Sequence, residues 1–151
     1  MRRVIKQGHR FDFKGVSNMA DLKAFDDVLK GCTLDYFKSG QYKIEFADFL
    51  ALKAEGKAMM LDLRTKEEAE VVALPFARNV PIDELPQALA DLPKDKLIVT
   101  FCASGVRAIM AFFYLKAAGY DCKIYMGKLN DLTGNFMPPF VAKNYDNLRN
   151  E

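Results

Sequence analysis

From about residue 42, hydrophobic positions alternate between strand-like and helix-like spacing. Strand-like runs fall at residues 42–46, 58–63, 77–80, 97–101 and 121–126. The run at 58–63 is short and mostly apolar, as in a strand buried on both faces, and the run at 97–101 is the clearest strand. Between them, helical spacing predicts helices in segments 46–56, 65–73, 82–89, 103–119 and 128–132. Strands that alternate with helices pair in parallel through right-handed crossovers. The pattern therefore predicts an α/β fold.

Residues 1–40 follow a different pattern, and we expect them to form a partly helical N-terminal extension. Ser17 or Asn18 can cap a helix that stops at Gly31. The apolar face of this helix consists of Met19, Leu22, Phe25, Val28 and Leu29. Such a face must be buried against the main domain or against a second subunit, so a homodimer is one alternative.

The remaining boundaries follow from the same pattern. Residues 41–134 form the main domain, and residues 135–151 form a tail that contains Pro138-Pro139 and is expected to be irregular chain. Residues 1–40 carry 8 basic and 5 acidic side chains, whereas residues 41–151 carry 14 and 15. The positive charge of the chain therefore belongs to the N-terminal extension.

Composition excludes several classes of protein. A chain of 151 residues suits one domain, and its net charge of +2 gives no case for nucleic-acid binding. No apolar run approaches the ~20 residues of a membrane helix, and no apolar stretch follows the basic start as in a signal peptide. Three cysteines do not make a disulfide framework, so a cytoplasmic location is expected.

Histidine chemistry is almost absent as well. With only His9 and no C-x-x-C pair, we expect no metal site and no cofactor. Serine–histidine or cysteine–histidine catalysis would require His9 to fold back from the N-terminus.

The candidate chemistry lies in one strand-to-helix loop, residues 102–107. Ligands of parallel α/β sheets bind beyond the carboxyl ends of the strands, and Cys102 stands at such an end, just before a helix. Free backbone N–H groups and the helix dipole point toward its sulfur, which favours the nucleophilic thiolate. Gly105 permits a tight turn, Ser104 offers a hydroxyl donor or a helix cap, and Arg107 can grip an oxyanion.

The sequence resembles the single-domain type of the rhodanese (sulfurtransferase) family. Four segments carry the resemblance in the family's order and spacing: CASGVR at 102–107 (C-x-x-G-x-R), LDLRTKEE at 61–68 (D-x-R-x-x-x-E), ARNVP at 77–81 (A-x-N-[IV]-P) and YMG at 125–127. The resemblance covers about residues 42–133. It implies a central five-stranded parallel sheet flanked by helices.

The resemblance also implies a set of site residues. Cys102 would carry sulfur as a persulfide, and the backbone and side chains of Ala103, Ser104, Gly105, Val106 and Arg107 would bind the persulfide and an anionic donor. Asp62 and Arg64 are candidates for the pocket rim, although a structural ion pair is the preferred interpretation. Lys128 stands where the family usually has a second glycine after Gly127, and it is a third candidate for the rim.

The implied reaction moves sulfane sulfur from thiosulfate or a persulfide, through Cys102, to a thiol, a protein cysteine or cyanide. Two alternatives remain at this stage. One is a catalytically weak rhodanese-fold binding module. The other is a cysteine phosphatase or arsenate reductase, whose C-x5-R loop is longer than the four residues that separate Cys102 from Arg107 here. Cys122 is expected to pack in the core, and Cys32 is a weak candidate for accepting sulfur.

Overall fold

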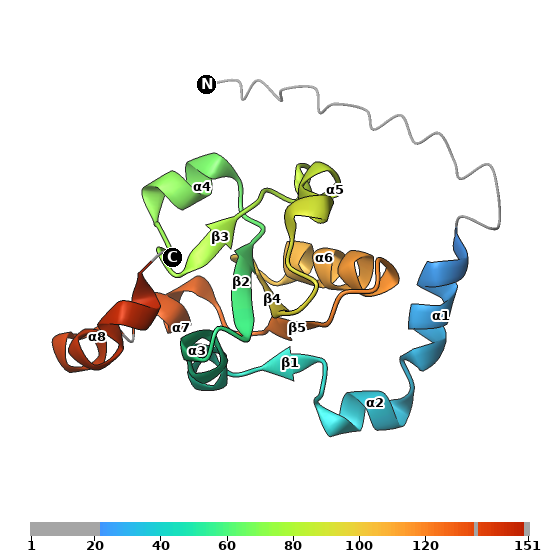
Figure 1. Cartoon of the computed structure of the whole chain (residues 1–151), viewed down its shortest axis with the longest axis horizontal. Helices are drawn as coiled ribbons and strands as arrows, with labels where there is room; N and C mark the ends of the chain where they lie inside the picture. The colour runs from blue at the N-terminus through green and yellow to red at the C-terminus, as the bar shows by residue number, and fades with distance from the viewer. Residues whose placement is uncertain (1–21, 135, 150–151) are drawn as a thin grey trace, which may run out of the picture.

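Five parallel strands form the centre of the molecule. The computed structural model describes residues 22–134 and 136–149. In order across the sheet, the strands are β1 (Lys43–Ile44), β5 (Cys122–Tyr125), β4 (Leu97–Phe101), β2 (Ala58–Asp62) and β3 (Ala77–Asn79), and every neighbouring pair is parallel (Figure 1). The predicted five-stranded parallel α/β sheet is confirmed.

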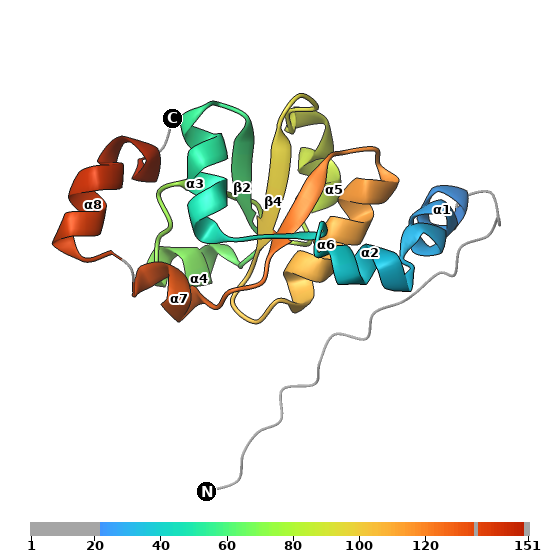
Figure 2. The ribbon, with the colours of Figure 1, turned by 90° about the horizontal axis from the view of Figure 1, so that it is seen from below.

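Helices cover both faces of this sheet because successive strand residues point to opposite sides. Ile98 of β4 belongs to one apolar core with α5 (Leu85–Ala88) and α6 (Val106–Ala117). Val99 and Phe101 belong to the other core, with α3 (Phe46–Ala54) and α7 (Leu129–Thr133). Figure 2 shows the strands between α3 and the pair α5–α6. The sheet is thus buried on both faces, as the apolar run at residues 58–63 predicts for its strand.

Two predicted segments differ in the structure. The helix expected over residues 82–89 is shorter, because Pro86 has no N–H to donate and fits only the first turn of α5; a 3₁₀ turn, Leu89–Asp91, follows. The tail is not irregular: it forms α8 (Pro138–Asn144) and a second 3₁₀ turn, Tyr145–Leu148. Its Phe140 ring lies 6.4 Å from that of Phe46, so packing on the core orders the tail.

The N-terminal extension packs on the main domain through α1 (Lys23–Gly31). The Phe25 ring meets Phe113 of α6 edge-on at 6.0 Å. None of the residues of α1 is fully buried, and Leu29 is 47% exposed. The helix ends at Gly31 as predicted, whereas its proposed caps, Ser17 and Asn18, lie outside the described residues. A short helix that the pattern did not predict, α2 (Leu34–Ser39), connects α1 to β1.

The helices of the described residues include none with the length and apolar character to cross a bilayer. Within the same residues, no three His, Cys, Asp or Glu side chains are grouped so as to hold a metal ion.

Candidate functional site

The Cys102 sulfur lies at the carboxyl end of β4 and accepts two backbone hydrogen bonds. The N–H of Gly105 donates to Sγ at 3.1 Å, and the N–H of Ala108 donates at 3.4 Å. The residue is only 1% exposed. The loop that follows β4 therefore curls around the sulfur and points peptide dipoles at it, an arrangement that favours negative charge there.

Gly105 makes this curl geometrically feasible. It begins α6 with φ of +90°, in the left-handed region that residues with a side chain rarely adopt. A methyl group built on Gly105 would meet no atom within 4 Å, so the requirement is for the backbone angle and not for space. Gly105, and not Ser104, is the helix N-cap, which removes capping as the role of Ser104 and leaves its exposed hydroxyl as a donor.

Arg107, at the end of the Cys102 loop, is held in place by an ion pair with Glu68 of α4 (Lys66–Val71). The guanidinium donates from both terminal nitrogens to the carboxylate, at 2.5 and 2.9 Å. The Arg107 hydrogen bonds are the largest cause of the low pKa of Glu68, which falls to about 2, and Glu68 in turn raises the pKa of Arg107. The cation beside Cys102 is thus fixed in place and partly neutralised.

Glu68 is itself positioned by the start of α4. Its Oε2 accepts the N–H of Thr65 at 2.9 Å, and the Thr65 hydroxyl accepts the N–H of Glu68, which completes a capping box. Thr65 and Glu68 stand three residues apart in the sequence, a spacing that predicts a capping box, and the structure confirms it. The sequence shows Glu68 as the last residue of the D-x-R-x-x-x-E segment and as a capping residue; its link to Arg107 becomes visible only when the fold brings α4 and α6 together.

Asp62 and Arg64 form a buried ion pair at the carboxyl end of β2. Each is 1% exposed, and their closest atoms, Nη2 and Oδ2, are 2.6 Å apart. Arg64 also donates to the carbonyl of Val72, and Asn79 donates to the carbonyls of Asp62 and Arg64. These contacts favour the structural interpretation of the pair, although Arg64 also contributes to the pocket beside the loop.

That pocket has a volume of about 410 Å³ and lies between α4, the Cys102 loop and the start of α7. Its lining residues are Arg64, Glu67, Glu68, Val71, Val72, Ala103 and Leu129. Lys128, the third rim candidate, is exposed at the cap of α7, next to Leu129. The structure thus brings Ala103, Arg107 and Glu68 together at the opening of this pocket, and Val71 forms part of its apolar wall.

The other cysteines lie far from this opening. Cys122 pairs with Ile98 in the sheet, four residues before Cys102, so about 13 Å of strand separates the two levels. Burial raises the pKa of the Cys122 thiol to about 12. All three cysteines are free, and Cys32 donates weakly to the carbonyl of Val28. His9 lies outside the described residues.

Comparisons with known proteins agree with this geometry. The rhodanese-like domain model matches residues 45–134. A tRNA sulfurtransferase from Psychromonas ingrahamii is 28% identical over 130 residues, which span 83% of this chain and 26% of that protein. Human thiosulfate:glutathione sulfurtransferase is 31% identical over 96 residues, 54% of this chain and 84% of that protein.

A solved structure shows the same fold. The human single-domain sulfurtransferase TSTD1 superposes with a TM-score of 0.51 at 26% identity, over 64% of this chain and 98% of that one. The chain spans only about a quarter of the tRNA sulfurtransferase that it matches. The family match covers more than half of the chain and includes the Cys102 loop. The chain belongs to the rhodanese-like domain family.

Proposed function

We propose that the protein is a sulfurtransferase that carries sulfane sulfur on Cys102. The observation that carries the proposal is the pair of backbone N–H groups, of Gly105 and Ala108, that point at the Cys102 sulfur. Relatives named as sulfurtransferases support the same reaction class. No histidine is required, because the nucleophile is a thiolate held by loop amides.

The first half-reaction loads the enzyme. The Cys102 thiolate attacks the outer sulfur of thiosulfate; a new S–S bond forms on Cys102, and the S–S bond of thiosulfate breaks to release sulfite. With a persulfide donor, the leaving group is a thiolate. The Val106 and Arg107 N–H groups, in the first turn of α6, have no intrahelical carbonyl to bind and can stabilise the charge on the outer sulfur.

The second half-reaction unloads it. An acceptor thiolate attacks the outer sulfur, takes it as a new persulfide and regenerates the Cys102 thiolate; cyanide would leave as thiocyanate. The names of the relatives suggest glutathione or a tRNA-modifying system as the final destination of sulfur. The exposed Ser104 and Val106 flank the route by which an acceptor would approach.

Arg107 has two tasks in this proposal. Its ion pair with Glu68 ties α6 to α4 and keeps the loop closed around the sulfur. Its remaining positive field attracts an anionic donor such as thiosulfate to the 410 Å³ pocket. A neutral donor would gain only from the first task.

The proposal is tested by intact-mass spectrometry after incubation with thiosulfate. We expect the protein to gain one sulfur atom and to lose it when cyanide is added. Cys102→Ser should gain none, whereas Cys122→Ser, a matched change in a buried cysteine, should load normally.

The same sample should hydrolyse aryl phosphates at no measurable rate, because four residues between Cys102 and Arg107 form a ring suited to one sulfur atom. Phosphate hydrolysis without sulfur loading would favour the cysteine phosphatase, and a folded protein with neither activity would favour the binding module.

A further inference from the structure

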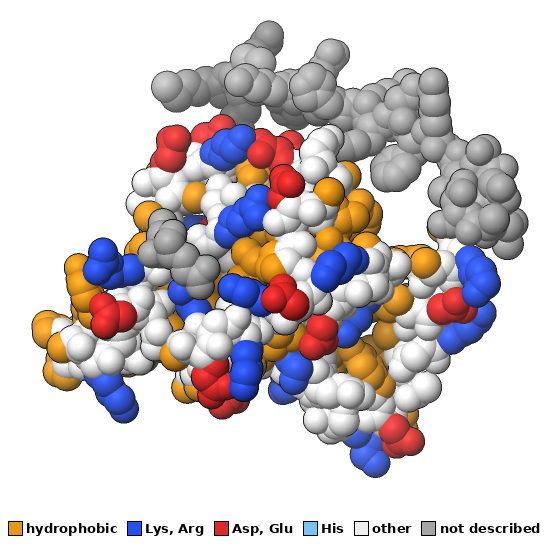
Figure 3. All heavy atoms as spheres, viewed as in Figure 1, with side chains coloured by type: hydrophobic (Ala, Val, Ile, Leu, Met, Phe, Trp, Pro, Cys, Tyr) orange, Lys and Arg blue, Asp and Glu red, His pale blue; other side chains and the backbone are white. Residues whose placement is uncertain are grey.

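An apolar groove lies between α1 and the pair α5–α6, away from the Cys102 loop. It has a volume of about 710 Å³, and its walls include Leu22 and Phe25 of α1, Ile82 and Pro86 at α5, and Met110 and Tyr114 of α6. Met110 is 59% exposed. Figure 3 shows hydrophobic side chains in the hollow between α1 and the main body. An apolar surface of this kind is typical of a site that another segment covers.

An acidic cluster lies next to the α5 end of the groove. It consists of Glu67 on α4 and of Asp83 and Glu84 just before α5, around Lys66, which binds Glu84; Arg78 and Asp91 border it on the α5 side. The hydrogen bond that Lys66 donates to Glu84, followed by the charges of Glu84, Asp83 and Glu67, raises the pKa of Lys66. Figure 3 shows acidic side chains gathered over α4 and toward α5. Four acids against two cations, Lys66 and Arg78, leave this surface with an excess of two negative charges.

Read backwards from Leu22, the sequence first has large apolar residues and then basic residues, an order that matches the apolar groove and the acidic cluster of this surface. Residues 11–19 include four large apolar residues, Phe11, Phe13, Val16 and Met19, with one acid and one base, Asp12 and Lys14, between them. Beyond them stand four basic residues: Arg2, Arg3, Lys6 and Arg10. Starting from Leu22, the surface likewise runs from apolar groove to acidic cluster, with α1, α6, α5 and α4 in succession (Figure 1).

The lengths also agree. Residues 11–19, if extended, would span about 30 Å. A helix with its side chains is ~10–12 Å wide, so this length suffices to cross α6 and α5. The basic residues 2–10 would then reach the acidic cluster.

We propose that residues 2–21 of the same chain dock on this surface, with Phe11 and Phe13 in the groove and the basic residues on Glu67, Asp83 and Glu84. The segment would thus cover the apolar groove.

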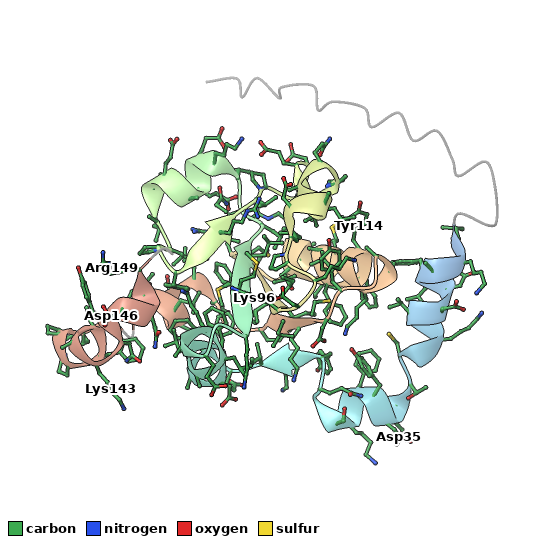
Figure 4. All side chains as sticks on the ribbon, in the orientation of Figure 1. Asp35, Lys96, Tyr114, Lys143, Asp146 and Arg149 are labelled. Carbon is green, nitrogen blue, oxygen red and sulfur yellow. The ribbon has the colours of Figure 1, made fainter. Side chains whose placement is uncertain are left out.

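Fluorescence of the full chain tests this docking. The chain has no tryptophan, so Tyr114→Trp supplies a single reporter on the groove wall (Figure 4). In this background, Phe11→Ser with Phe13→Ser should shift the emission to the red and increase quenching by acrylamide. Asp83→Lys should do the same more weakly, and less at high salt. The matched control is Asp146→Lys, a similarly exposed acid on the opposite side of the molecule, which should change neither signal.

Two outcomes would overturn the proposal. Unchanged emission in the Phe11→Ser, Phe13→Ser variant, with the fold intact by circular dichroism, would mean that the segment does not enter the groove. Emission that depends on protein concentration in the Tyr114→Trp parent would mean that a second copy covers the groove instead. Both readouts are independent of sulfur transfer.

Discussion

At the scale of single residues, the site depends on a backbone angle at Gly105 and on one carboxylate, Glu68. The left-handed angle at Gly105 turns the loop so that its own N–H and that of Ala108 meet the Cys102 sulfur. Glu68 then fixes Arg107 from the neighbouring helix. Neither residue needs to react for the sulfur to be held in its place.

Gly105→Ala should therefore impair the site more than the fold. The side chain forces a strained backbone angle at a cost of about 1–2 kcal/mol, or it shifts the loop and moves the N–H groups away from Cys102. Gly119→Ala is the matched control, because Gly119 has φ of +79° at the other end of α6. We expect similar losses in urea-denaturation stability for the two variants, but slower sulfur loading only for Gly105→Ala. Equal loading rates would show that the loop angle is irrelevant to the sulfur site.

Glu68→Gln should make the free energy of unfolding less dependent on pH in the acidic range. Arg107 lowers the folded-state pKa of Glu68 from 4.5 to about 2, so the ion pair contributes fully above pH ~4.5 and its contribution is lost as pH falls toward 2. For a partly exposed pair the loss is on the order of 0.2–1 kcal/mol. Urea midpoints of the wild type and Glu68→Gln should differ at pH 7 and converge near pH 2. Glu70→Gln, an exposed change on the same helix, should show no such convergence.

At the scale of elements, the hydrophobic pattern predicted the strands, whose positions depend on the local sequence. It missed the helix at the C-terminal end, whose order depends on contacts with distant residues. The strands were placed within about a residue or two because buried parallel strands have continuous apolar runs. The helix over 138–144 was missed because its order comes from Phe140 packing on Phe46, which no local pattern reveals. The start of α2 did carry a signal: Thr33 accepts the Tyr36 N–H, and Gly40 ends the helix with φ of +66°. With six residues, α2 is too short for a periodicity to stand out.

For the candidate site, too, the sequence predicts the local part and misses the contact between distant segments. The Cys102 loop and its position at a strand end follow from the strand-to-helix pattern. The Glu68–Arg107 pair joins residues 39 apart in the sequence, so only the packing of α4 beside α6 could disclose it.

The connection between β2 and α4 rests on the buried Asp62–Arg64 pair. Asp62→Asn would leave the Arg64 charge buried without its partner, at a cost of about 3–5 kcal/mol. Glu84→Gln removes a carboxylate from the exposed ion pair with Lys66 and should cost less than about 1 kcal/mol. Thermal denaturation should separate the two clearly. A small effect of Asp62→Asn would mean that the carbonyls that bind Arg64 hold it without the carboxylate.

At the scale of the whole molecule, the parallel sheet separates the cysteines. The carboxyl ends of the strands present Cys102 to the pocket, whereas Cys122 lies at the amino end of β5. Cys32 directly follows α1, and Tyr36, four residues further along, packs against the core cluster that contains Cys122. In the proposed reaction, sulfur bound to Cys102 would therefore lie at the opposite end of the sheet from Cys122.

This separation predicts that sulfur leaves the chain directly from Cys102, without an internal relay through Cys32. Cys32→Ser should turn over thiosulfate with glutathione at the wild-type rate, because no step uses its thiol. Peptide mapping of the loaded protein at low concentration should find the extra sulfur on the Cys102 peptide alone. At high concentration, transfer between two molecules could mark Cys32, and dilution should remove that signal. Sulfur on Cys32 that persists on dilution, together with slower turnover of Cys32→Ser, would require a movement of α1 that brings Cys32 to the carboxyl end of the sheet.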